Sequence, residues 1–85
     1  MQAPLIHLNG TSRQSLLDQL CDASAAVREA INALCTASPN GRDYYPLGPE
    51  AYKRALDEHQ SRYDRLTSVR RELEELTEAI ADAGH

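Results

Sequence analysis

The 85-residue sequence contains no Trp and no Phe, and it has only four Tyr. Its large aliphatic residues number sixteen, comprising eleven Leu, three Ile and two Val. A chain this short buries a modest share of its surface, so it often needs disulfides, a metal or a second copy for stability. Its two Cys allow one disulfide at most. These shortages favour a single small domain that associates with itself.

Other absences exclude whole classes of function. No apolar run approaches the roughly 20 residues of a membrane span. The first ten residues, MQAPLIHLNG, lack the basic region and long apolar core of a signal peptide, so we expect a cytoplasmic protein with reduced thiols. The net charge of −4 argues against general nucleic-acid binding. The His and Cys residues have no metal-ligand spacing, and no nucleotide-binding or hydrolase motif is present. We therefore expect no metal, no cofactor and no enzymatic activity.

Residues 11–38 are predicted to form the first of two long helices. Thr11 and Gln14 have the spacing of a capping box, which predicts a helix start at Thr11. Pro39 cannot continue the helix and is followed by an Asn-Gly turn pair. The predicted apolar stripe follows a heptad pattern through Leu17, Leu20, Ser24, Val27, Ile31 and Leu34.

Residues 49–83 are predicted to form the second helix, after a loop at 39–48. Gly48 suits the N-cap and Pro49 the first helical position, and Leu47 and Tyr52 have the spacing of a hydrophobic staple. Its apolar stripe comprises Tyr52, Leu56, His59, Tyr63, Leu66, Val69, Leu73, Leu76 and Ile80.

These elements predict an all-α fold, an antiparallel helical hairpin over residues 1–85 with a short extended N-terminal arm at 1–10. The second helix is longer by about two turns, and the β-prone segment Leu5–Leu8 is predicted to cover its free end near Leu73, Leu76 and Ile80. Because one hairpin leaves apolar surface over, we expect a homodimer or higher oligomer that forms a helix bundle.

The cysteines and His59 have reactive side chains, but the sequence predicts structural roles for them. Cys21 and Cys35 lie about 21 Å apart along one helix, too far to bond within a chain, and are expected to be buried, reduced thiols. Pairing between chains stays open. His59 is expected to be a hydrogen-bonded core or interface group. The run Asp57-Glu58-His59 lacks a nucleophile and an oxyanion site, so no catalytic residue is predicted.

The charges of the second helix separate along its length. Basic residues predominate up to Arg71, whereas the end carries Glu72, Glu74, Glu75, Glu78 and Asp82. One interpretation is a solvated face with intrahelical ion pairs such as Glu58 with Arg62. The other is an electrostatic pattern that aligns the helix antiparallel to another chain.

Two segments carry side chains suited to binding. In NGRDYYP, Arg42 offers a planar donor fork for an anion, and the two tyrosines offer flat faces for stacking or protein contact. In HLNGTSR, free N–H groups lie at a helix N-terminus beside polar and basic side chains. The candidate ligand-binding residues are Arg42, Tyr44, Tyr45, Asn9, Thr11, Ser12 and Arg13. In the competing interpretation, Arg42 pairs with Asp43 and the tyrosines cap the bundle end.

The two segments are a helix length apart within one chain. An antiparallel dimer would bring HLNGTSR of one chain to NGRDYYP of the other, which predicts two composite binding pockets.

The segments IHLNGTSRQSLL and PNGRDYYPLGPEA, with the helical stretches between and after them, resemble a family of small helical proteins of tailed bacteriophages and prophages. The resemblance covers most of the chain and brings no catalytic residue. It implies a phage accessory protein in the host bacterial cytoplasm. The leading hypothesis is a counter-defence protein that binds a small anionic, nucleotide-like ligand between subunits. The alternatives are an inhibitor or adaptor that binds a host defence protein, and a structural or assembly protein of the virion.

Overall fold

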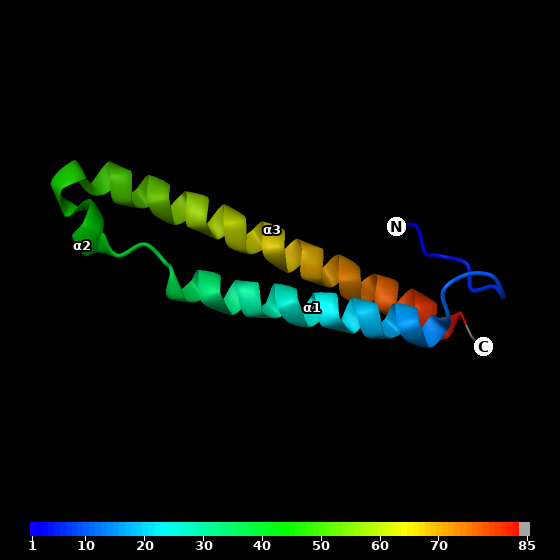
Figure 1. Ribbon diagram of the computed structural model, residues 1–85. Helices are drawn as coiled ribbons and strands as arrows, with labels where there is room; N and C mark the ends of the chain where they lie inside the picture. Colours follow the sequence, from blue (N-terminus) through cyan, green and yellow to red (C-terminus); the bar gives the residue numbers. More distant parts are fainter. Residues whose placement is uncertain (84–85) are drawn as a thin grey trace.

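The computed structural model describes residues 1–83, and these form a helical hairpin without a strand (Figure 1). Helix α1 spans Arg13–Thr36 and helix α3 spans Pro49–Asp82, and the two pack side by side. A short helix α2, Gly41–Tyr44, and a 3-10 turn η1, Tyr45–Leu47, connect them. The molecule is a rod of 62 × 19 × 18 Å. The predicted all-α hairpin is confirmed, and no described helix is long and apolar enough to cross a membrane.

The N-cap of helix α1 lies one residue later than the sequence predicts. Ser12 has an extended backbone, with φ −64° and ψ 154°, and its hydroxyl oxygen accepts a hydrogen bond from the N–H of Ser15 at 3.2 Å. The amide of Gln14 donates forward to Asp18 at 2.8 Å instead of reaching back to the cap. The predicted Thr11 capping box is therefore wrong. Either hydroxyl could serve chemically, and the backbone conformation at Ser12 decides between them.

The start of α3 agrees with its predicted signals. Gly48 is the N-cap with φ 91° and ψ 167°, a conformation that is essentially restricted to glycine. Pro49 occupies the first helical position, where a missing N–H costs no hydrogen bond. Leu47 stays 70% exposed, so it gains little of the burial that a staple with Tyr52 implied.

The connection sets the register of the two long helices. The side chains of Ser38 and His59 lie 3.1 Å apart at one end of α1, and Arg13 donates to the carbonyl oxygen of Ala81 at 3.4 Å at the other. Helix α1 therefore lies beside residues 59–81 of α3. The part of α3 that extends beyond α1 is residues 49–58, next to α2 and η1.

The predicted overhang at Leu73, Leu76 and Ile80 is consequently wrong. Segment 39–48 is not an open loop, because α2 and η1 carry the chain past the end of α1 before α3 begins. Helix α1 itself covers the end of α3, and Ile80 is only 1% exposed.

The N-terminal arm, residues 1–12, runs beside the C-terminal end of α3 without regular structure (Figure 1). A turn from His7 to Gly10 closes with a 3.1 Å hydrogen bond between their backbones. Only Ile6 of the arm's large apolar residues is half-buried, and Leu5 and Leu8 are exposed. The predicted covering of α3 by these two leucines is wrong, since α1 already fills the place.

The hairpin has little core of its own. Among the described residues, only Ile31 and Ile80 are buried, and most other stripe positions are half-buried. Two helices meet along one line, so each side chain is covered from one side only. Cys21 and Cys35 are free and exposed, which corrects the prediction that they are buried. A single neighbouring helix leaves both side chains open to solvent.

Candidate functional site

The connection from Ser38 to Gly48, which we call the elbow, has a shape that its own residues stabilise. Asn40 caps α2, because its side-chain oxygen accepts a hydrogen bond from the N–H of Arg42 at 2.9 Å. The N–H of Asp43 donates to the carbonyl of Asn40 at 3.0 Å. Pro46 restricts the backbone of η1, and Gly48 reverses it into α3. The elbow therefore presents its side chains from a defined backbone.

Three tyrosines form an aromatic cradle on the elbow. The rings of Tyr44 and Tyr52 lie 6.0 Å apart between centroids, with an angle of 35° between their planes. The tyrosine cradle encloses about 390 Å³ and is lined by Gly41, Tyr44, Tyr45, Gly48, Pro49 and Tyr52. Gly41 and Gly48 have no side chains to fill this hollow, and none of its lining residues is charged. Such a surface suits a flat or apolar group.

The three rings differ in exposure. Tyr44 and Tyr52 are half-buried, whereas Tyr45 is 85% exposed. Tyr44 thus contributes to the packing of the elbow on α3, as the capping interpretation proposed for it. Tyr45 has almost all of its ring available to a partner. The sequence analysis placed Tyr52 in the helix stripe and did not associate it with the other two, and its position three residues after Pro49 was the only signal.

Arg42 is exposed beside the cradle and is not one of its lining residues. In residues 1–83 the ion pairs are Glu58 with Arg62 at 3.7 Å and Arg70 with Glu74 at 3.1 Å. The alternative in which Arg42 pairs with Asp43 is therefore not realised. The predicted pair between Glu58 and Arg62 is confirmed.

The second group of candidate residues lies at the opposite end of the rod. Asn9 and Thr11 are exposed, Ser12 caps α1, and Arg13 is bonded to Ala81 across the hairpin. A single chain therefore does not bring these residues to Arg42.

A polar pocket of about 310 Å³ adjoins the elbow, and the sequence analysis did not identify it. Its lining includes Ser38 and His59, whose Oγ and Nε2 atoms lie 3.1 Å apart. The Ser38 hydroxyl donates to the carbonyl oxygen of Cys35 at 2.8 Å. The hydroxyl of Ser38 therefore lies within hydrogen-bond distance of both the Cys35 carbonyl oxygen and the His59 ring. This contact agrees with the hydrogen bond expected of His59.

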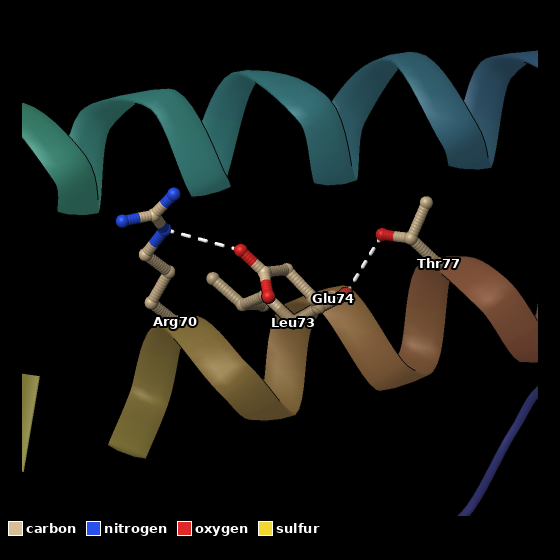
Figure 2. Close-up of polar contacts among 4 residues, drawn as sticks. All are labelled: Arg70, Leu73, Glu74 and Thr77. Atoms are coloured by element: carbon tan, nitrogen blue, oxygen red, sulfur yellow. Dashed lines mark hydrogen bonds and ion pairs between the residues drawn. The ribbon is translucent and has the colours of Figure 1, made fainter. Parts of the chain in front are cut away.

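A wider hollow of about 470 Å³ lies between α1 and α3 and was also missed. Small side chains of α1, Ser24 and Ala25, face Glu74 and Thr77 of α3 there. Figure 2 shows that the Arg70–Glu74 ion pair lies on the side of α3 towards α1, and that Thr77 donates to the carbonyl of Leu73 at 2.7 Å. Intrahelical bonds satisfy these groups. Small residues in the helix contact leave this hollow open, and its lining also includes Cys21, Arg28 and Glu78.

In the described part of the chain, no group of three or more His, Cys, Asp or Glu side chains could hold a metal ion. The elbow is therefore the best candidate site, and its chemistry is stacking, apolar contact and anion pairing. Comparisons with models of protein families, with curated proteins and with solved structures found no match.

Proposed function

We propose that the protein is a non-enzymatic, homo-oligomeric binding protein whose elbow is the binding end. The observation that supports this most is the tyrosine cradle, an aromatic hollow on a defined backbone beside an exposed arginine that has no ion pair within residues 1–83. Preorganised side chains lose little entropy on binding, which favours a recognition role.

The ligand that fits best is small, flat and anionic, such as a nucleotide. A base can stack on the exposed face of Tyr45, and a phosphate can accept two hydrogen bonds from the Arg42 fork. The volume of about 390 Å³ lies in the range of small-molecule sites, roughly 300 to 1,000 Å³. Asn9, Thr11, Ser12 and Arg13 of a second chain would complete the site.

We further propose that this binding serves a bacteriophage as counter-defence in the host bacterial cytoplasm. The resemblance of the two segments to phage and prophage proteins motivates the setting, and capture of a nucleotide signal is a task that a small binding protein performs without catalysis.

A host protein is the second candidate partner. The apolar lining of the cradle, together with the exposure of Tyr45 and Leu47, favours it, because exposed aromatic and aliphatic side chains are frequent anchors of protein interfaces. This candidate does not need Arg42.

Calorimetric titration with nucleoside monophosphates, triphosphates and cyclic dinucleotides tests the proposal. We expect Arg42→Ala to weaken binding by at least about tenfold and Arg42→Lys to restore it only in part, because lysine lacks the planar fork. Arg54→Ala is the matched control, since Arg54 is also exposed but lies on α3 outside the cradle.

Melting curves of the same variants should agree within about 0.5 kcal/mol, because an exposed arginine without an ion pair contributes little to stability. If no nucleotide binds, or if Arg42→Ala and Arg54→Ala bind equally well, the anionic-ligand proposal is wrong.

A further inference from the structure

The most exposed large apolar side chains gather at the two ends of the rod. Met1, Leu5 and Leu8 of the arm are 73%, 82% and 98% exposed, and Tyr45 and Leu47 of the elbow are 85% and 70% exposed. The first eight residues contain no Asp, Glu, Lys or Arg. Both ends thus present uncharged apolar surface of the kind that usually contacts a partner.

The arm of a chain cannot cover the elbow of the same chain. Helix α1 has 24 residues and is about 36 Å long, and the elbow lies beyond its far end (Figure 1). Leu5 precedes Arg13 by eight residues, so a fully extended arm places it about 29 Å from the start of α1 at most. Contact between these two surfaces therefore requires a second molecule.

The accessible surface of the chain is larger than that of a compact monomer of the same mass. The accessible surface is 6472 Å². A compact monomer of 9.4 kDa exposes about 5,000 Å² on the usual relation between mass and area. The excess, about 1,500 Å², is more than the roughly 800 Å² that each partner buries in a standard stable interface.

Charge along α3 selects an antiparallel partner. Residues 49–71 contain six basic and four acidic side chains, a net charge of +2, whereas residues 72–82 contain five acidic and no basic side chains, a net charge of −5. Side by side and antiparallel, the acidic end of one α3 faces the basic part of the other. A parallel pair would place the two acidic ends together.

We propose that two copies pair antiparallel and that the arm of each, through Leu5 and Leu8, packs across Tyr45 and Leu47 of the other. The arm then forms the second wall of the open tyrosine cradle and brings Asn9–Arg13 towards the partner's elbow. The inference deepens the proposed function, because it names the part of the second chain that completes the site. Two-fold symmetry uses both arms and both elbows, so the assembly closes.

Site-directed cross-linking tests this contact. In a background with Cys21→Ser and Cys35→Ser, one preparation carries Leu5→Cys and another Leu47→Cys. After mixing and mild oxidation, we expect a covalent dimer with one chain of each kind. The matched control pairs Leu5→Cys with Asp18→Cys, an exposed position near the far end of the partner, and should give none.

Three results would overturn the inference. The first is a mixture that does not cross-link although light scattering shows a dimer. The second is a Leu5→Cys preparation that cross-links with itself, as a parallel dimer would. The third is a chain that is monomeric at micromolar concentration. Light scattering that shows filaments of growing mass would contradict the closed two-fold pairing.

Charge substitution provides a second measurement that does not depend on thiol geometry. Leu5→Asp should raise the dissociation constant of the dimer by at least about tenfold, since burial of a leucine side chain is lost. Gln2→Asp adds the same charge to the arm at a polar, exposed position and should change it far less. Nucleotide titration of the cross-linked dimer separates the two proposals, because a cross-linked dimer that binds no nucleotide contradicts the proposed function alone.

Discussion

At the scale of single residues, the elbow depends on two glycines with different roles. Gly48 has φ 91° and ψ 167°, a backbone region in which a side chain is strained even though nothing lies within 4 Å of its missing Cβ. Gly41 has no positive φ, and a Cβ there would meet the ring of Tyr52 at an ordinary 3.8 Å. The elbow thus needs glycine for its conformation at Gly48, whereas the space at Gly41 admits a methyl group.

Alanine substitution should separate these roles. We expect Gly48→Ala to lower the free energy of unfolding by about 1 to 3 kcal/mol, because the strained conformation persists in the folded state. Gly41→Ala should leave stability unchanged or raise it slightly, since alanine favours the helix. Urea denaturation measures both changes. Equal effects of the two substitutions would show that φ at Gly48 does not limit the stability of the elbow.

At the scale of the elements, the two long helices begin in different ways. Ser12 supplies the hydroxyl that caps α1, whereas Thr11 is exposed and outside the helix. Gly48 and Pro49 start α3 without a side-chain cap. The acidic residues at the C-terminal end of α3 interact unfavourably with the helix dipole, so we expect nearby positive charges to stabilise this end.

We expect Ser12→Ala to cost about 1 kcal/mol of stability, because one N–H in the first turn loses its partner. Thr11→Ala should cost less than about 0.5 kcal/mol, as for most exposed positions. Thermal melts of the two variants measure the difference. A larger loss of stability for Thr11→Ala than for Ser12→Ala would show that Thr11 is the N-cap, as the S/T-x-x-E/Q spacing predicted.

At the scale of the whole molecule, a rod with two buried side chains in its described part presents its remaining apolar surface to solvent. Leu56 and Val69, at 40% and 42% exposure, lie along the rod between the apolar ends. A hairpin of this kind is half of a helix bundle, and a second copy is the simplest source of the other half.

Aspartate substitutions should therefore act differently at a position buried between the two helices and at an exposed position on the surface of the hairpin. Ile31→Asp places a charge at a buried position and should unfold the chain, at a cost of several kcal/mol. Val69→Asp should leave the helix content intact and dissociate the oligomer. Circular dichroism and light scattering at micromolar concentration distinguish the two outcomes. A parent chain that is a folded, cooperative monomer would contradict the oligomer proposal.

The candidate site could be predicted only in part. Arg42, Tyr44 and Tyr45 were identified because charged and aromatic residues between Pro39 and Pro46 do not fit a passive turn. Tyr52 was not associated with them, because its contact depends on how η1 folds back onto α3. The exposed positions of Cys21 and Cys35 were missed as well, since burial on the flank of a helix depends on how many partners the helix has.

The sequence by itself determined the two long helices and their approximate ends. Heptad spacing, Pro39 and the Gly48-Pro49 pair act within a few residues, so they can be interpreted locally. Only the tertiary structure decided the register, which leaves residues 49–58 of α3 beyond α1 and keeps Leu5 and Leu8 exposed. The physical reason is that the span of the connection depends on whether its eleven residues, 38–48, are coiled or extended, and local patterns do not specify that choice.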